Sequence, residues 1–306
     1  MLKQISLLIL CAVAIVLFAT PVQACTSAVV SGKVTPDGRP LLWKNRDTDF
    51  MRNHVDYVKG EKYDFIAVVN SANAYLKEAW MGTNSAGFAL MNTQSYNLVD
   101  IKGDEERGAA NGRVIYRALE VCATVADFCH FLDTISKPSD IEANFGVIDA
   151  QGGAAMFEVD YYKYVMYDAN NPKDAPYGYI ARTNFSFAGK VNEGAGYVRY
   201  MEADQVLMKA SATGSITPQF IFNDLSRSFR NRMLDIDLRS GAYNRPQASG
   251  WFVDQDFIPR SSTSCSVVVQ GVKPGEKAEL TTMWTLLGYP PTGIAVPLWV
   301  KDAGKL

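Results

Sequence analysis

Short apolar runs bounded by turn residues occupy the chain between positions 25 and 93. Such runs are typical of β-strands, and we expect strands at 25–30, 40–44, 64–70 and 87–93. Between the first two runs, Pro36-Asp37-Gly38 has the chemistry of a hairpin turn, so these two strands are expected to pair. The range 82–87, which holds two glycines, is interpreted as a turn before the fourth strand.

From position 111 the apolar residues follow the spacing of a helix, three and four positions apart. Thr124 and Asp127 suit the start of a second helix, so we expect two short helices rather than one. A later helical stretch covers 196–210 and 218–229. Further strands are expected at 144–149, 154–159, 161–167, 177–182, 264–269, 278–284 and 294–300.

Groups of strands therefore alternate with groups of helices along the chain, an order that favours an α+β fold. The sequence contains no charge run, no low-complexity linker and no internal repeat. We expect a single domain over residues 25–306, in which sheets carry helices on their outer faces.

The first 24 residues have the pattern of a signal peptide. Lys3 is their only charged residue, an apolar run follows over 5–19, and small residues close the segment at Val22 and Ala24. The apolar run is shorter than the roughly 20 residues that a membrane-spanning helix needs. We expect cleavage after Ala24 and export of the protein to the periplasm or the medium, with no membrane attachment afterwards.

The composition excludes several functional classes. The 306 residues include 48% hydrophobic and 20% charged residues, with a net charge of −2, so nucleic acid is not an expected partner. Two histidines and no C-x-x-C pair argue against a metal site, and neither common nucleotide-binding loop is present. We therefore expect chemistry that needs no cofactor and no metal.

Cleavage after Ala24 would make Cys25 the first residue, carrying both a thiol and a free α-amine. Three roles for Cys25 stay open: a catalytic nucleophile, a lipidated cysteine or half of a disulfide. Val22 and Gln23 depart from the usual lipoprotein signal, which favours the nucleophile. Cys122 and Cys129 are interpreted as core residues, which could pair only if the helix breaks near position 123.

An N-terminal cysteine can supply both nucleophile and base. A thiol attacks carbonyl groups as its thiolate, a minor species at neutral pH, and an α-amine titrates near pH 8, so it can accept the thiol proton. A carboxylate must hold that amine, and hydrogen-bond donors must face the tetrahedral oxyanion.

Three segments of the chain resemble a known family. Cys25-Thr26-Ser27, Asp37-Gly38 and Lys44-Asn45-Arg46-Asp47 are similar to the opening of the choloylglycine hydrolase and penicillin acylase group of N-terminal-nucleophile (Ntn) hydrolases, and of the acyl-coenzyme A:6-aminopenicillanic acid acyltransferase-like branch. The alignment implies that Asp47 is the catalytic aspartate, with Lys44 where bile salt hydrolases have arginine. A rival register pairs Arg46 with that arginine and Asp49 with the aspartate.

Two weaker matches extend the resemblance. The segment 82–92 is similar to the family strand that ends in an oxyanion-hole asparagine, which implies this role for Asn92. Arg182-Thr183-Asn184 is similar to a Thr-Asn pair beside the nucleophile, which implies that Asn184 also stabilises the oxyanion. No arginine stands at the position of a late family arginine, although Arg260 lies nearby.

The resemblance implies a four-layer αββα sandwich and hydrolysis of a linear amide C–N bond through an acyl-enzyme on Cys25. The substrate would be a small-molecule N-acyl amide or a conjugated amino acid. The sequence leaves three alternatives open: hydrolase, acyltransferase on the same site, or non-catalytic lipoprotein. Since relatives often form homo-oligomers, such an assembly is also left open.

Overall fold

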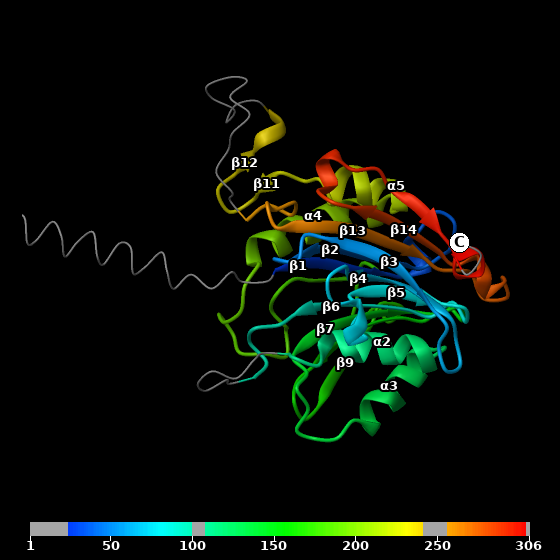
Figure 1. The fold of residues 1–306 in the computed structure, drawn as a ribbon. Helices are drawn as coiled ribbons and strands as arrows, with labels where there is room; N and C mark the ends of the chain where they lie inside the picture. The colour runs from blue at the N-terminus through cyan, green and yellow to red at the C-terminus, as the bar shows by residue number, and fades with distance from the viewer. Residues whose placement is uncertain (1–23, 100–107, 241–255, 304–306) are drawn as a thin grey trace, which may run out of the picture.

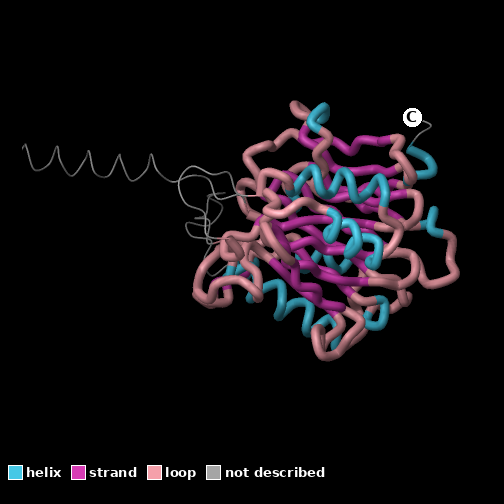
Figure 2. Tube along the Cα trace, turned by 90° about the horizontal axis from the view of Figure 1, so that it is seen from below, coloured by secondary structure: helices cyan, strands magenta, loops and turns pink. Residues whose placement is uncertain are grey.

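The protein is described here by a computed structural model, which covers residues 24–99, 108–240 and 256–303. Two antiparallel sheets lie face to face, with helices on their outer sides (Figure 1). A view turned by 90° shows helices lying across the strands (Figure 2). This is the four-layer αββα arrangement that the family resemblance implied.

The first sheet contains six strands and carries the start of the domain. Its spatial order is β10 (Tyr179–Arg182), β1 (Cys25–Val30), β2 (Leu41–Asp47), β13 (Thr263–Gln270), β14 (Thr282–Leu287) and β15 (Val296–Leu298). The expected hairpin of β1 and β2 forms, with Val30 opposite Leu41. The outer face of this sheet packs against α4 (Tyr197–Ala212), α5 (Pro218–Phe220) and the π-helical turn Ile221–Leu225.

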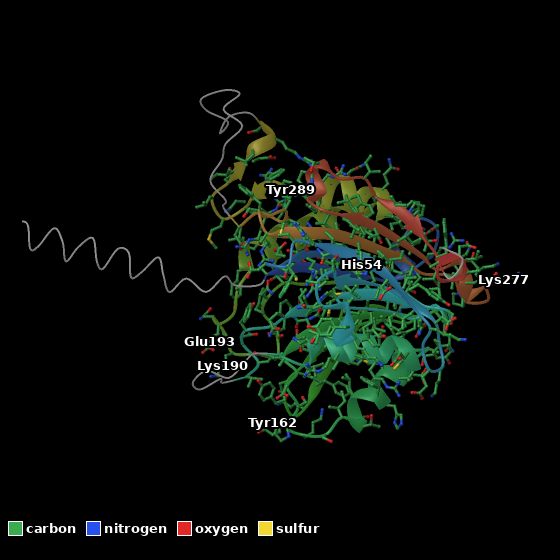
Figure 3. The ribbon with its side chains drawn as sticks, in the orientation of Figure 1. His54, Tyr162, Lys190, Glu193, Lys277 and Tyr289 are labelled. Atoms are coloured by element: carbon green, nitrogen blue, oxygen red, sulfur yellow. The ribbon has the colours of Figure 1, made fainter. Side chains whose placement is uncertain are left out.

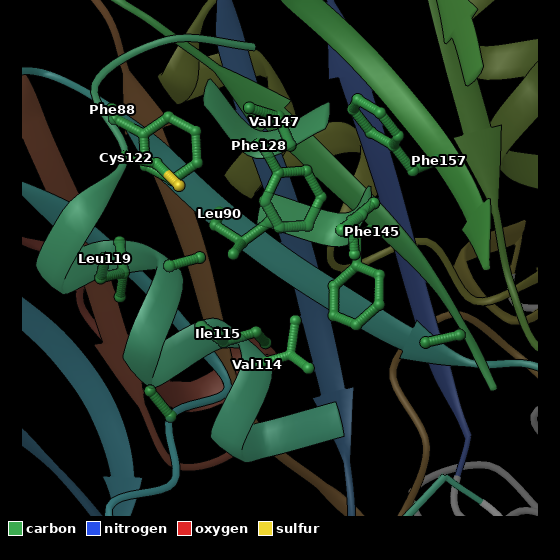
Figure 4. Packing of buried hydrophobic residues seen from close by; sticks show 14 of the residues in the cluster. Phe88, Leu90, Val114, Ile115, Leu119, Cys122, Phe128, Phe145, Val147 and Phe157 are labelled. Atoms are coloured by element: carbon green, nitrogen blue, oxygen red, sulfur yellow. The ribbon is translucent and has the colours of Figure 1, made fainter. Parts of the chain in front are cut away.

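The second sheet contains seven strands in chain order. They are β3 (Asn53–Val58), β4 (Phe65–Asn70), β5 (Met81–Asn84), β6 (Ala89–Gln94), β7 (Ala143–Ile148), β8 (Ala154–Val159) and β9 (Tyr164–Asp168). Its outer face is covered by α2 (Asn111–Val121) and α3 (Val125–Thr134). Phe128 of α3 packs against Phe145 and Phe157 of the sheet and against Phe88, which directly precedes β6 (Figure 4).

Apolar side chains from both sheets fill the space between them, in addition to those that pack against the helices on the outer faces. Val29, Leu42 and Val267 of the first sheet contact Met81 and Met91 of the second within one buried cluster. Burial of this much apolar surface stabilises the stacking and fixes which face of each strand points inward. Because side chains alternate along a strand, Lys44 and Arg46 share the inner face with Leu42.

The structure corrects several sequence expectations. The predicted turn at 82–87 begins as strand β5, where a side chain at Gly82 would collide with the carbonyl oxygen of Ile66 at 2.5 Å. The strand β3 was not predicted, because polar residues interrupt its apolar pattern at Asn53 and Asp56. Three predicted elements are shorter than expected: 218–229 is helical only to Leu225, 278–284 is strand only from Thr282, and 294–300 only over Val296–Leu298.

The helix break near position 123 is real, since α2 ends at Val121 and Thr124 caps α3 with Asp127 in a capping box. Cys122 and Cys129 are nevertheless free, and Cys129 is only partly buried. Of the expected signal peptide, residues 1–24, all but Ala24 lie outside the described residues. In the part of the chain that the structure describes, no helix is both long and apolar enough for a membrane span.

Candidate active site

Cys25 begins β1, a strand flanked by β10 and β2 within the first sheet. In the ladders on both sides of β2, Cys25 lies directly opposite Arg46, and Arg46 lies directly opposite Cys265 of β13. Residues opposite one another share one face of an antiparallel sheet, so the three side chains form a row facing the second sheet. The Cys25 side chain is largely buried, with 7% of the residue exposed.

The peptide bond between Ala24 and Cys25 is held at both of its polar atoms. Its carbonyl oxygen accepts a hydrogen bond from the backbone nitrogen of Asp47 at 2.9 Å. Its nitrogen, which belongs to Cys25, donates to Oδ1 of Asn184 at 2.8 Å. Asp47 and Asn184 therefore lie on either side of the bond whose cleavage would release the α-amine.

Asn184 follows β10 and is fixed by a network from the second sheet. Its Nδ2 donates to the carbonyl oxygen of Gln94 at 2.8 Å. The side-chain amide of Asn144 donates to the carbonyl oxygens of the neighbours of Asn184, Thr183 and Phe185, at 3.2 Å each. These bonds orient Oδ1 of Asn184 toward the nitrogen of Cys25, so this atom acts as an acceptor.

A buried ion pair supports the loop that follows Asn184. Glu158 of β8 accepts from Nε of Arg182 at 2.6 Å, and the two side chains are 0% and 4% exposed. The same carboxylate accepts from the backbone nitrogens of Phe187 and Ala188. Figure 3 labels Lys190 and Glu193 farther along this loop. The pair thus joins the two sheets beside the candidate site.

Asp47 ends β2 in a buried setting. Its Oδ1 accepts from the hydroxyl of Thr263 at 2.5 Å, whereas its Oδ2 is buried with no hydrogen-bond partner among the described residues. Burial raises the pKa of Asp47 to about 6, and the positive charge of Arg199 opposes this effect. A buried carboxylate oxygen without a donor is costly, so Oδ2 is suited to bind an added donor such as an α-ammonium.

Lys44 connects the first sheet to Asn92. Its Nζ donates to Oδ1 of Asn92 at 2.9 Å and to the carbonyl oxygen of Trp80 at 3.1 Å. Burial lowers the pKa of Lys44, and neighbouring charges act in both directions. Because Oδ1 of Asn92 is occupied, its Nδ2 points elsewhere, and no described residue accepts a bond from it. Asn92 can therefore donate to a substrate oxygen.

The two registers considered for the family arginine and aspartate differ in the structure. Arg46 donates to Asn53 and Asn70, and its guanidinium lies 4.7 Å from the ring centre of Trp80. Asp49, the aspartate of the rival register, is exposed in the loop after β2. Asp47, by contrast, is buried beside the backbone of Ala24. The surroundings of Cys25 therefore favour Asp47 over Asp49, whereas Lys44 and Arg46 both lie on the face of the sheet that carries the Cys25 side chain.

The sequence did not reveal one of the residues that contact Cys25. Arg199 of α4 is 1% exposed and donates to the carbonyl oxygen of Cys25 at 2.5 Å and to Oδ1 of Asn184 at 2.9 Å. It also pairs with Asp256 at 2.9 Å. Arg260 lies close by, 3.6 Å from Asp256, and its charge also lowers the pKa of Asp47. No sequence motif marks an arginine that the fold buries inside a helix packed on a sheet.

The described residues contain no group of three or more His, Cys, Asp or Glu side chains placed to hold a metal ion. Cys25 is a free thiol, as is the buried Cys265 two strands away. The structure places the five predicted site residues in two bonded groups. Cys25 bonds to Asn184, with Asp47 on the preceding Ala24, and Lys44 bonds to Asn92. The charge of Cys25 also acts on Lys44.

A family model describes more than half of the chain. The model of acyl-coenzyme A:6-aminopenicillanic acid acyl-transferase matches residues 34–211. The chain belongs to this family. The matched range begins after Cys25 and includes the other four predicted site residues, as well as Arg199. No curated protein sequence matches the chain.

Three solved structures are similar in fold to this acyltransferase-family member. A variant of conjugated bile acid hydrolase from Clostridium perfringens has a TM-score of 0.50 at 12% identity, over 89% of this chain and 92% of that chain. The penicillin V acylase of Agrobacterium tumefaciens has a TM-score of 0.44 at 15% identity, over 86% of this chain and 82% of that chain. A Caenorhabditis elegans ortholog of N-acylethanolamine-hydrolyzing acid amidase has a TM-score of 0.44 at 15% identity, over 66% of this chain and 89% of that chain.

Proposed function

We propose that the chain is an exported hydrolase of linear amides, trimmed after Ala24, with Cys25 as nucleophile and its own α-amine as base. The substrate is a small N-acyl amide or a conjugated amino acid. The observation that carries this proposal is the position of the peptide bond before Cys25, held between Asp47 and Asn184. Membership in a family of amide acylases and acyltransferases supports the same reaction class.

The first half of the reaction forms an acyl-enzyme. The amine of Cys25 accepts the thiol proton while the sulfur attacks the amide carbonyl carbon, giving a tetrahedral oxyanion. Collapse of this intermediate breaks the C–N bond, and the ammonium of Cys25 returns its proton to the leaving amine. In the second half, water loses a proton to the same amine and attacks the thioester carbon. The C–S bond then breaks, the ammonium returns the proton to the sulfur of Cys25, and the carboxylic acid is released.

The contacts of the site support a distinct role for each partner. Asn184 orients the nitrogen of Cys25 through Oδ1, and the unpaired Oδ2 of Asp47 can accept from the new ammonium. Asn92 is the better placed donor to the oxyanion because Lys44 holds its Oδ1. The Lys44 ammonium supports the negative charge that develops near Asn92. In this assignment Asn184 orients the base rather than binding the oxyanion.

Acyl transfer differs from hydrolysis only in the second acceptor. If an amine reaches the thioester before water, the same residues complete an acyltransferase reaction. The family name favours transfer, whereas the matched structures include hydrolases. We propose hydrolysis as the main reaction because water is always present at the site of an exported enzyme.

The decisive experiment uses protein that begins at Cys25 and a panel of N-acyl amino acids, each labelled on the acyl group. Release of the labelled acid by the wild-type protein, and its loss in the Cys25→Ala variant, is the expected result. Added amines would capture a measurable share of label if transfer competes. Equal release by wild type and Cys25→Ala would overturn the proposal.

The lipoprotein alternative makes a different prediction about mass. Lipidation alkylates the thiol of Cys25 and acylates its amine, so it removes both catalytic groups. The mass of the exported protein is expected to equal that of residues 25–306. An excess of several hundred daltons would instead identify a lipid anchor and end the assignment of Cys25 as nucleophile.

A further inference from the structure

The guanidinium of Arg199 contacts the first two residues of β1 and the side chain of Asn184. Its Nη1 donates to the carbonyl oxygen of Cys25 at 2.5 Å and to the hydroxyl of Thr26 at 3.0 Å. Its Nη2 donates to Oδ1 of Asn184 at 2.9 Å. That oxygen also accepts from the nitrogen of Cys25, so the guanidinium and the future amine converge on one atom.

The fourth contact of Arg199 comes from another part of the chain. Its Nε donates to Oδ1 of Asp256 at 2.9 Å, and Asp256 is about one third exposed, at 32%. Asp256 has a backbone φ of 60°, in the left-handed region that non-glycine residues adopt infrequently. A residue held in this conformation is maintained by its surroundings, and the contact with Arg199 is one such constraint.

This geometry affects the chemistry of the amine in two ways. Arg199 fixes the oxygen of Asn184 toward the nitrogen, and it holds a positive charge within a few ångströms of that nitrogen. A nearby positive charge disfavours protonation of an amine, and a nearby negative charge favours it. Arg199 and Asp256 therefore act in opposite directions on the same group.

We propose that Arg199 is a positioning residue that keeps the Cys25 amine in its basic form, and that Asp256 moderates this effect from the edge of the site. The inference rests on the proposed function, since it concerns the base of that reaction. It assigns a role to a residue on α4 that lies outside all the motifs identified in the sequence.

Other charged groups act on the same region, so the pH profile must be interpreted against them. They come from each element packed around Cys25. The groups are Lys44, Arg46 and Asp47 on β2, Cys265 on β13, the pair of Arg182 on β10 and Glu158 on β8, Arg199 on α4, and Asp256 and Arg260 in the segment before β13. Removal of a single charge from this set tests its own contribution, since the others stay in place.

The test is the acid limb of kcat/KM against pH, measured with the N-acyl amino acid that the wild type hydrolyses fastest. Arg199→Gln removes the positive charge, and we expect the acid limb to move to higher pH by about 1 unit. Asp256→Asn removes the opposing negative charge, and we expect the acid limb to move to lower pH. Arg199→Lys keeps the positive charge but loses the planar set of guanidinium donors. The acid limb of this variant should therefore stay in place while its kcat falls.

If Arg199 and Asp256 had only a structural role, Arg199→Gln and Asp256→Asn would not shift the acid limb in opposite directions. Arg113→Gln, which removes an exposed arginine of α2 paired with Glu78 in the loop before β5, is the matched control and should leave the acid limb unchanged. Coincident acid limbs in wild type, Arg199→Gln and Asp256→Asn would overturn the inference. If Arg199→Gln does not fold, Asp256→Asn and Arg199→Lys still decide it.

A second readout needs no substrate. The pH dependence of Cys25 alkylation by iodoacetamide, followed by peptide mass, should shift in the same two directions. Absence of both shifts in protein whose amide hydrolysis depends on Cys25 refutes only the role of Arg199. Hydrolysis that survives in Cys25→Ala refutes the proposed function itself, so the two failures can be told apart.

Discussion

The side-chain oxygen of Asn184 accepts a hydrogen bond from the main-chain nitrogen of Cys25 at 2.8 Å, although 159 positions separate the two residues. Its amide nitrogen is bonded to Gln94, so the side chain cannot turn without loss of both bonds. Asn184 therefore fixes the direction in which the α-amine of the trimmed chain can point.

Replacement of Asn184 by leucine should lower kcat by about 100-fold or more, because a base that is not oriented loses most of its contribution. The substrate KM should change much less, since Asn184 contacts the nucleophile rather than the acyl group. Steady-state kinetics on protein that begins at Cys25 provides the measurement. A variant with unchanged kcat would show that the amine needs no such acceptor.

Asn92→Ala should lower kcat by about 100- to 1,000-fold, the usual cost of one oxyanion-hole donor. Lys44→Met should reduce kcat in the same direction, because Oδ1 of Asn92 would lose the donor that orients its amide. Asn223→Ala, at an exposed position, is the matched control. Equal kcat values in Asn92→Ala and in the control would exclude Asn92 from the oxyanion hole.

Asp47 should make folding stability depend on pH in the chain that retains Ala24. Burial raises its pKa from 3.8 to about 6, so the folded state binds the proton more tightly than the unfolded state. The contribution of this group is therefore favourable below pH 4 and is lost as the pH rises through 6. Asp47→Asn should then stabilise the fold at pH 8, relative to its effect at pH 4, by on the order of 2 kcal/mol.

Urea unfolding of both proteins at the two pH values measures this difference. The same substitution should abolish activity in trimmed protein, because the amine loses its carboxylate. A stability difference independent of pH would contradict the account of Asp47 as a buried carboxylate whose Oδ2 has no donor among the described residues until the amine is released.

The buried pair of Glu158 and Arg182 should be important for stability. Glu158→Gln leaves the guanidinium buried without its counter-charge, which typically costs about 3–5 kcal/mol. Glu279→Gln breaks an exposed pair with Lys301 and should change the unfolding free energy by less than about 1 kcal/mol. Chemical denaturation of the two variants gives the comparison, and similar losses in both would refute it.

Much of the fold could be predicted from sequence because local pattern and packing agree. The pairing of β1 with β2 and the capping box at Thr124 both form as expected, although a 3-10 helix at Gly32–Val34 precedes the turn at Pro36-Asp37 in the connection. The pattern failed where tertiary contacts decide the structure. Strand β5 includes Gly82 because the carbonyl oxygen of Ile66 leaves no room for a side chain, and glycine in a sequence is otherwise a turn signal.

The candidate site was predictable only in part for a similar reason. Cys25 and Asp47 lie in a short segment with a specific motif, so the resemblance could place them. Arg199 is buried by the packing of α4 on the first sheet, and its partners Cys25, Asn184 and Asp256 are remote in sequence. Such convergence has no local signature, because it depends on strand register and helix placement.

The central claim is that a free amine on Cys25 is the catalytic base. Two proteins test it most directly: one that begins at Cys25, and one that retains Ala24 with a preceding residue. We predict that only the first hydrolyses the N-acyl amino acid, since an amide nitrogen in the second cannot accept the thiol proton. Equal kcat/KM in the two proteins would contradict the account.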